Sequence, residues 1–193
     1  INRKGTGTGQ MSRTAIFIAE GFEEIEALTA VDLLRRAEIE IQMVSINGNR
    51  TVTGSHGITV QCDTLFENVE FDSLDMIILP GGAPGTKNLD AFAPLKDRIR
   101  EFDQQGRYIS AICAAPGILG RMGLLKGRKA CSYPTTEDQL DGAQVQHTET
   151  VISDHILTSR GMGTATAFGL AIVGRLQGEE KAEKLGRAIV YKQ

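Results

Sequence analysis

The sequence has no tryptophan, and its aromatic residues together make up only 5% of 193 residues. Its three cysteines lack the spacing of a disulfide framework or of a metal site, so we expect free thiols, no metal, no cofactor and a reducing cytoplasm. The net charge is −3 and no basic run stands out, which argues against nucleic acid and anionic membrane as partners. No apolar run approaches the length of a membrane span.

Residues 1–10 are polar, rich in glycine and without periodicity. We interpret them as a disordered remnant of an expression tag, and Met11 as the native start. Residues 11–193 are long enough for one complete hydrophobic core and show no internal boundary, so we expect a single domain.

Strand and helix patterns alternate through this domain. Apolar runs separated by amphipathic segments are typical of an α/β fold with a mainly parallel sheet and helices on both faces. A glycine-containing turn also predicts a small β-hairpin at residues 51–60. The expected strands are residues 14–19, 39–46, 75–79, 108–112, 129–132 and 156–159, and the expected helices are residues 23–37, 94–105, 114–120, 164–176 and 179–190.

Unusual residues directly follow four of the predicted strands. They are the acidic segment 20–26, the glycine-containing segment 80–82, Cys113, and residues 160–164. Parallel α/β sheets bind ligands at the carboxyl ends of their strands. We therefore expect these segments to converge on one crevice.

Cys113 stands at a sharp junction between a predicted strand and a predicted helix. Ala111 and Ala115 are small enough for a nucleophile elbow, and Pro116 suits the first turn of a helix. The free amides and positive dipole end of that helix favour the thiolate, which is the reactive form of cysteine. The alternative is a buried structural cysteine.

The acidic residues after the first predicted strand are of two kinds. Glu23 and Glu24 suit the first turn of a helix, where the helix dipole stabilises negative charge. Glu26 shares a stripe with the apolar residues Ala30 and Leu33. We expect burial to raise the pKa of Glu26, so that it can donate a hydrogen bond to a nearby thiolate or sulfinate. The alternative is a carboxylate without a special role.

Two glycine segments suggest binding sites for anions. The amides of Gly81, Gly82 and Ala114 could form an oxyanion hole, although an ordinary turn also explains a pair of glycines. Residues 161–164 resemble a phosphate cradle but lack the spacing and the lysine of nucleotide-binding motifs. We interpret them as a tight turn, with Thr164 as the N-cap of the next helix.

Histidines are too few to assign a catalytic triad. A cysteine protease or amidotransferase needs an imidazole to activate its nucleophile, and the chain has only His56, His147 and His155. His56 lies in the predicted hairpin, from which it could reach the crevice of its own subunit or of a neighbour. We interpret His147 and His155 as solvated surface residues, and Cys62 and Cys131 as structural.

Four segments of the chain together resemble motifs of the ThiJ/PfpI superfamily, and within it those of the DJ-one and bacterial ThiJ branch. The motifs run in the family's order between about Met11 and the C-terminus, at residues 20–27 (EGFEEIEA), 79–82 (LPGG), 111–116 (AICAAP) and 157–164 (LTSRGMGT). The resemblance implies a flavodoxin-like three-layer α/β sandwich that is usually a homodimer.

The resemblance also implies roles for individual residues. Cys113 matches the family's reactive cysteine, and Glu26 matches the protonated glutamate that hydrogen-bonds to it. The remaining matches are backbone amides around the site and an arginine that orients and charges the pocket, namely Gly81, Gly82, Ala114 and Arg160.

Members of the superfamily have been assigned glyoxalase activity on methylglyoxal, deglycase activity, and redox sensing through a cysteine sulfinate. Protease-like members have a histidine directly after the cysteine, where this chain has Ala114, so we exclude a peptidase. Some relatives have a histidine about twenty residues beyond the cysteine, where this chain has Tyr133. The older link of ThiJ with thiamine-precursor metabolism has no chemical support in the sequence.

Two functions follow from Cys113 and Glu26. In the first, the thiolate attacks a small reactive dicarbonyl such as methylglyoxal, and Glu26 shuttles protons without a cofactor. In the second, a redox-responsive protective or regulatory protein, an oxidant converts Cys113 to a sulfinate that Glu26 stabilises. A third interpretation is a flavodoxin-like binding domain whose cysteine is incidental.

Overall fold

The structure, a computed structural model, describes residues 11–192, so the interpretation of residues 1–10 lies outside the described residues. A seven-stranded sheet with the order β10-β11-β7-β6-β1-β2-β5 forms its centre. Neighbouring strands are parallel except that β10 runs antiparallel to β11. The strands are β1 (Arg13–Ile18), β2 (Glu40–Ser45), β5 (Thr64–Leu65), β6 (Met76–Leu79), β7 (Tyr108–Ile112), β10 (Thr150–Ser153) and β11 (Ile156–Ser159).

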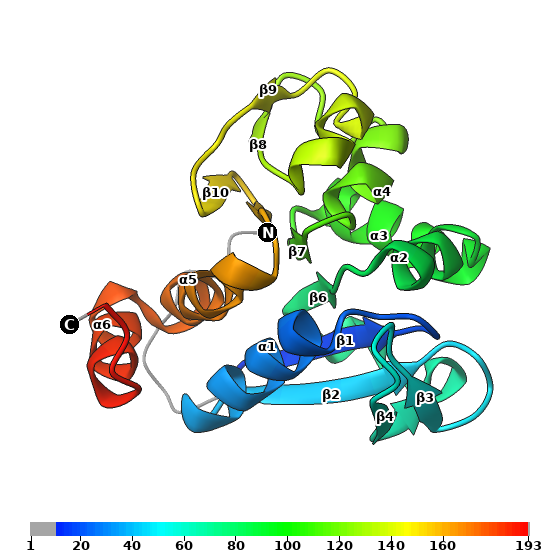
Figure 1. The fold of residues 1–193 in the computed structure, drawn as a ribbon, viewed down its shortest axis with the longest axis horizontal. Coiled ribbons are helices and arrows are strands. Elements are labelled where there is room, and N and C mark those ends of the chain that lie inside the picture. The colour runs from blue at the N-terminus through cyan, green and yellow to red at the C-terminus, as the bar shows by residue number, and fades with distance from the viewer. Residues whose placement is uncertain (1–10, 193) are drawn as a thin grey trace.

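Helices cover both faces of this sheet (Figure 1). Alternate residues of a strand point to opposite faces, so Ile16 and Ile18 of β1 join one hydrophobic cluster and Ala15 and Phe17 join another. The predicted three-layer α/β sandwich is confirmed. The first cluster includes residues of α1 (Glu24–Arg36), α5 (Ala165–Gln177) and α6 (Glu179–Ala188), and the second includes residues of α2 (Ala83–Asp90), α3 (Ala93–Gln105) and α4 (Pro116–Arg121).

Two small sheets lie outside the central sheet. β3 (Thr51–Thr53) and β4 (Thr59–Gln61) form the predicted antiparallel hairpin. β8 (Lys129–Ala130) pairs with β9 (Gln144–Val145). The strand predicted at residues 129–132 is therefore shorter than expected, and it does not belong to the central sheet.

Several elements of the fold were not predicted, namely the two-residue strands β5 and β9, the four short 3-10 turns, β10 and α2. β10 begins and ends with the polar residues Thr150 and Ser153 at the edge of the sheet, so it lacks a continuous apolar run. α2 contains a proline and a glycine, which disfavour helix interiors. The remaining helices are short 3-10 turns: η1 (Phe66–Asn68), η2 (Phe71–Ser73), η3 (Pro134–Gln139) and η4 (Met162–Thr164).

Helix ends follow the expected signals with two differences. α3 ends at Gly106, whose φ of +67° is the left-handed value typical of a helix C-terminus. α4 begins at Pro116, later than expected, and has only six residues. Thr164 precedes α5 as predicted, but its hydroxyl bonds to Gly161 and Ser159 instead of capping the helix. Among the described residues, no helix has the length and apolar character needed to cross a membrane.

Candidate active site

Segments that follow several strands meet at the carboxyl edge of the sheet. Cys113 follows β7, and its amide donates to the carbonyl oxygen of Ser159 at the end of β11, at 3.0 Å. Gly81 follows β6 and packs so closely that an added Cβ would stand 2.5 Å from Cβ of Cys113. The same Cβ would stand 2.5 Å from Oε1 of Glu26, which lies on α1. The structure therefore brings Cys113, Glu26 and Gly81 together.

Cys113 has the backbone conformation of a nucleophile elbow. Its φ of +66° is a left-handed value, which strains a residue with a side chain. Ala111 and Ala115 are fully buried at the turn, where larger side chains would need space. Cys113 itself is 8% exposed, whereas Cys62 and Cys131 are at 0%. Strain at a thiol that solvent reaches favours a functional cysteine over a structural one.

Glu26 is fully buried, at 0% exposure. Its Oε1 accepts a hydrogen bond from the Gly81 amide at 3.0 Å, and its Oε2 has no hydrogen-bond partner among the described residues. Burial raises the pKa of Glu26 to about 7; the Cys113 thiol and the Gly81 amide oppose this rise, and the charge of Glu23 adds to it. The expected rise in the pKa of Glu26 is confirmed.

The pKa of Cys113 departs from the sequence-based expectation. Burial raises it most, and the charge and hydrogen bond of Glu26 raise it further, to about 12. The amides of Gly82 and Ala114 lower this pKa, as expected, but by less. The prediction that the helix terminus favours the thiolate is therefore wrong for the resting site, because the sulfur is desolvated beside a carboxylate.

Cys113 and Glu26 consequently titrate as one unit. Since the pKa of Glu26 is about 7, the pair loses one proton near neutral pH. The proton that remains stays on the sulfur, whose pKa is about 12, and the ionised carboxylate beside it can accept that proton when the sulfur attacks. A group half ionised at the working pH is suited both to accept and to donate a proton during a reaction.

The amides of the glycine pair have different partners. Because Gly81 already donates to Glu26, it does not belong to an oxyanion hole, contrary to the expectation. The amides of Gly82 and Ala114 instead act on the Cys113 sulfur, whose pKa they lower. Gly82 reaches this position with a φ of +92°, which favours glycine. These two amides can stabilise negative charge on the sulfur or on an oxygen attached to it.

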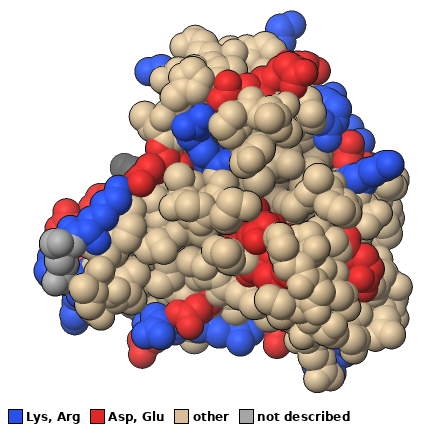
Figure 2. Space-filling view, viewed as in Figure 1, with Lys and Arg blue, Asp and Glu red and all other residues tan. Residues whose placement is uncertain are grey.

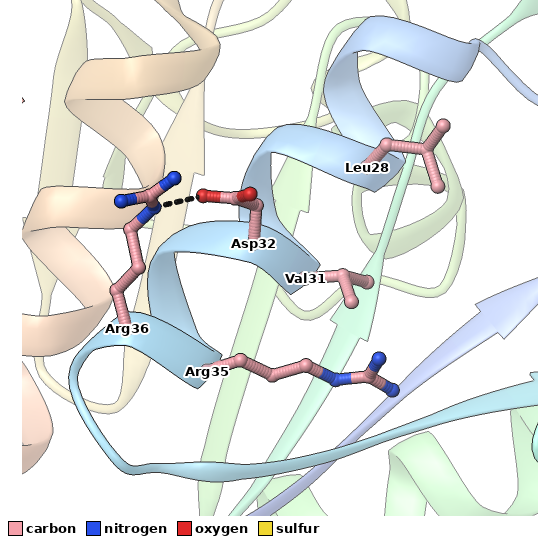
Figure 3. A pocket seen from close by; sticks show the side chains of 5 residues that line it. All are labelled: Leu28, Val31, Asp32, Arg35 and Arg36. Carbon is pink, nitrogen blue, oxygen red and sulfur yellow. Dashed lines mark hydrogen bonds and ion pairs between the residues drawn. The ribbon is translucent and has the colours of Figure 1, made fainter.

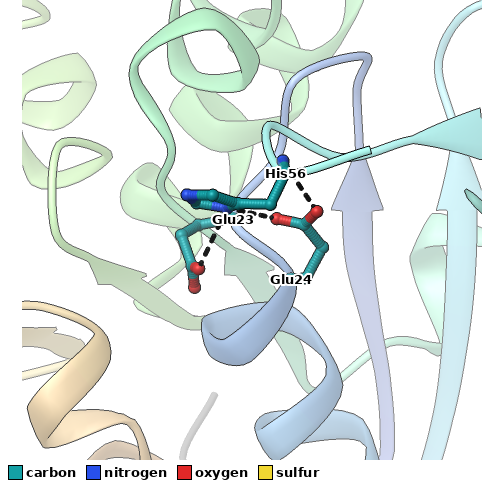
Figure 4. A group of neighbouring side chains, drawn as sticks. All are labelled: Glu23, Glu24 and His56. Carbon is teal, nitrogen blue, oxygen red and sulfur yellow. Dashed lines mark hydrogen bonds and ion pairs between the residues drawn. The ribbon is translucent and has the colours of Figure 1, made fainter. Parts of the chain in front are cut away.

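His56, from the β3–β4 hairpin, lies against Glu23 and Glu24 at the start of α1 (Figure 4). Its Nδ1 lies 2.9 Å from Oε1 of Glu24 and 3.9 Å from Oε1 of Glu23. Burial alone would raise the pKa of Glu24, but hydrogen bonds, led by that of the His56 side chain, lower it to about 2. The same contact raises the pKa of His56.

Acidic atoms are visible over the start of α1 in the middle of this face (Figure 2). Glu23, Glu24 and His56 offer possible ligand atoms within 4.8 Å of one another. However, both oxygens of Glu24 already accept hydrogen bonds, from the His56 ring and from the amides of His56 and Ile58. We therefore assign no metal to this cluster.

Arg160 contacts an acidic residue that the resemblance does not specify. Its guanidinium lies 3.5 Å from Oε1 of Glu137, and the charges of both residues act on Cys131. The groups that change the pKa of Cys113 are Glu26 and two backbone amides. A role for Arg160 in charging the pocket therefore stays a prediction.

Sequence reasoning missed two neighbours of the site. The Tyr133 amide donates to the carbonyl oxygen of Cys113 at 2.8 Å, and its ring lies against Gly161. The sequence signal for this neighbour was Tyr133 itself, at the position where some relatives have a histidine. Glu23 caps α1 by accepting the Glu26 amide at 2.8 Å. A glutamate three residues before Glu26 was the signal for this cap.

The other predicted residues lie away from the reacting groups. His147 is exposed, as expected. His155 is largely buried, contrary to the expectation, because its Nε2 lies 2.7 Å from Oδ1 of Asp103 before the start of β11. Cys62 and Cys131 are fully buried free thiols, which agrees with structural roles.

The comparisons with known proteins agree with this geometry. Residues 12–175 match the model of the DJ-1/PfpI family. The chain belongs to the DJ-1/PfpI family. Protein dj-1beta of Drosophila melanogaster is 36% identical over 183 residues, which cover 93% of this chain and 98% of that protein. The DJ-1/PfpI assignment confirms the resemblance carried by the four sequence motifs.

Two further DJ-1 relatives add detail. Glutathione-independent glyoxalase DJR-1.2 of Caenorhabditis elegans is 31% identical, over 91% of this chain and 94% of that protein. The structure of oxidized DJ-1 from Toxoplasma gondii matches with a TM-score of 0.90 and 34% identity, over 94% of this chain and 100% of that one.

The buried carboxyl group predicts a specific pH dependence of stability. The folded pKa of Glu26, about 7, lies above its ordinary value of 4.5. The stability that protonation of Glu26 contributes is therefore fully present below pH 4.5 and is lost as pH rises through 7. Glu26→Gln removes this loss. Between pH 4.5 and 8 we expect the free energy of unfolding of Glu26→Gln to rise by about 3 kcal/mol relative to wild type, measured with urea.

Glu24→Gln is the matched control, because the pKa of Glu24 is lowered to about 2. The stability that ionised Glu24 contributes is present above pH 4.5 and disappears as pH falls through 2, so Glu24→Gln loses stability at neutral pH. Parallel pH profiles for wild type and Glu26→Gln would contradict the assignment.

The shared proton also predicts the pH profile of thiol reactivity. Because ionised Glu26 can take the thiol proton as the sulfur attacks, we expect alkylation of Cys113 by iodoacetamide to rise with pH and level off, with a midpoint near the pKa of Glu26, about 7. In Glu26→Gln the midpoint moves to higher pH, because no carboxylate accepts the thiol proton. Mass spectrometry of the Cys113 peptide measures the rate, and an unchanged midpoint in the variant would show that the residues titrate separately.

Proposed function

We propose that this protein is a cysteine-dependent enzyme of glyoxalase type, which converts small α-oxoaldehydes such as methylglyoxal to 2-hydroxy acids. The observation that carries the proposal is the buried pair of Cys113 and Glu26, in which a nucleophile lies beside a carboxyl group with a pKa near 7. The glyoxalase name of the Caenorhabditis elegans relative supports the same chemistry.

The first step forms a bond between Sγ of Cys113 and the aldehyde carbon. Ionised Glu26 takes the thiol proton as the sulfur attacks, which avoids the high pKa of an isolated Cys113 thiol, and the carbonyl oxygen then receives that proton. The product is a hemithioacetal. The amides of Gly82 and Ala114, which face the sulfur, stabilise the negative charge that develops during attack.

The second step is an internal oxidation and reduction within the substrate. Glu26 removes the hydrogen of the former aldehyde carbon as a proton and returns a proton to the neighbouring carbon, while the hydroxyl proton moves to the second oxygen. The result is a thioester of a 2-hydroxy acid. Water hydrolyses the thioester, which releases the acid and restores the thiol. Because the electrons stay within the substrate, the reaction balances without a redox cofactor.

Early methylglyoxal adducts are hemiaminals and hemithioacetals that dissociate to the free aldehyde and an amine or thiol. Consumption of that aldehyde by Cys113 would reverse them, so we include deglycase activity in this proposal. Three buried free thiols suit a reducing compartment, and we propose a cytoplasmic location.

We also propose a homodimer that uses the outer side of α1. Ile25 is 55% exposed on this helix, and a surface hollow lies along the same helix (Figure 3). Asp32 and Arg36 form an ion pair there, and two antiparallel copies of α1 could exchange such pairs. The hollow is lined by Leu28, Val31, Asp32, Arg35 and Arg36.

The test of the proposed activity is formation of lactate from methylglyoxal by freshly reduced protein, in buffer without amines or thiols. We expect turnover in wild type and a loss of at least about a hundredfold in Cys113→Ser and in Glu26→Gln, because each removes one half of the pair. Cys62→Ala is the matched control and keeps its activity. Unchanged turnover in Cys113→Ser or in Glu26→Gln would contradict the proposal.

A redox-responsive role is the second candidate, because Cys113 keeps 8% exposure whereas Cys62 and Cys131 have none. One peroxide molecule oxidises the thiol to a sulfenic acid and releases water, and a second gives the sulfinic acid. Protonated Glu26 would donate a hydrogen bond to the sulfinate. The oxidized state of the Toxoplasma gondii structure is a reason to test this role.

For this role we expect mild peroxide to add two oxygen atoms to Cys113 while Cys62 and Cys131 stay reduced, since both are at 0% exposure. Peptide mass spectrometry measures the three sites separately. Equal oxidation of all three cysteines would reject the redox role.

A further inference from the structure

The β3–β4 hairpin holds an imidazole against the acidic first turn of α1. Nδ1 of His56 lies 2.9 Å from Oε1 of Glu24, and the His56 amide donates to Oε2 of the same carboxylate at 2.8 Å. The hairpin has little freedom to move inward, because a Cβ on Gly54 would stand 2.5 Å from Cδ of Glu24. His56 is therefore fixed in place although its side chain is 65% exposed.

Glu23 connects this imidazole with the reacting pair. Its Oε1 lies 3.9 Å from Nδ1 of His56, and its Oε2 accepts the backbone amide of Glu26 at 2.8 Å. The side chain is only 5% exposed, so solvent screens its charge weakly. The charge of Glu23 raises the pKa of Glu26, which is the group that exchanges a proton with Cys113.

We propose that His56 is a positioning residue, which controls through Glu23 how tightly Glu26 holds its proton and so how readily Cys113 reacts. A protonated imidazole offsets the negative charge of Glu23, and a neutral imidazole leaves that charge uncompensated. The proposal needs the shared proton of Cys113 and Glu26, but it does not depend on which substrate the thiol attacks.

The surrounding charges allow this coupling. Among the described residues, the charges that act on His56 are those of Glu24 and Glu23, and the charged or titratable groups that act on Glu26 are Glu23 and Cys113. Glu23 is thus the residue common to both. The effect is also reciprocal, since ionisation of Glu26 favours the protonated imidazole as much as the imidazole favours ionised Glu26.

The direction of the effect follows from the charges. Loss of the imidazolium leaves Glu23 uncompensated, and Glu26 then holds its proton to higher pH. We expect His56→Gln to raise the midpoint of Cys113 alkylation by about half a pH unit, which is about threefold slower alkylation below the midpoint, because an exposed charge acts weakly. His56→Arg carries a charge that does not titrate near neutrality, and it keeps the midpoint at or slightly below that of wild type.

The experiment is the pH profile of iodoacetamide alkylation of Cys113 in the full chain, from pH 5.5 to 9.5. His155→Gln is the matched control, because His155 pairs with Asp103 before the start of β11 and does not act on the site. We expect its midpoint to equal that of wild type. Equal midpoints for His56→Gln and His56→Arg would overturn the proposal, because charge at this position would then have no effect.

Glu23→Gln completes a double-mutant cycle. This variant keeps an oxygen that can cap α1 but removes the charge, so we expect a lower midpoint than wild type and no further change when His56→Gln is added. A full His56→Gln shift in the Glu23→Gln background would overturn the route through Glu23. Lactate formation is measured separately, so failure of the glyoxalase proposal and failure of this one are distinguishable.

Discussion

The approach of Cys113 to Glu26 depends on the absence of a side chain at Gly81. A Cβ there would stand 2.5 Å from both Cβ of Cys113 and Oε1 of Glu26, and 2.9 Å from the carbonyl oxygen of Ile112. These groups come from segments far apart in the sequence, and the Gly81 amide then fixes the carboxyl group through a 3.0 Å hydrogen bond. Close packing at Gly81 therefore determines how near the Glu26 carboxyl group and the Cys113 thiol can lie.

The rest of the fold supports groups that are unfavourable by themselves. A carboxyl group at 0% exposure and a left-handed cysteine both destabilise the folded state. Both lie at the ends of elements with fully buried apolar residues, which form clusters on the two faces of the sheet. The rigid core offsets these unfavourable terms and holds the reacting atoms in register.

The sequence predicts most of this arrangement because buried parallel strands and amphipathic helices have distinct patterns. Glu26 was also visible, since a carboxyl group on an apolar stripe is unusual. The pKa of Cys113 was not predictable, because it depends on how deeply the sulfur lies and how closely Glu26 approaches. The Gly81 hydrogen bond and the contact of His155 with Asp103 likewise depend on tertiary packing between distant segments.

The left-handed backbone of Cys113 lowers the stability of the fold but is needed to place a thiol at this turn. At a φ of +66°, a side chain costs about 1 kcal/mol relative to glycine, so the residue that best suits this turn carries no nucleophile. Cys113→Gly would therefore give a more stable fold that has lost its thiol.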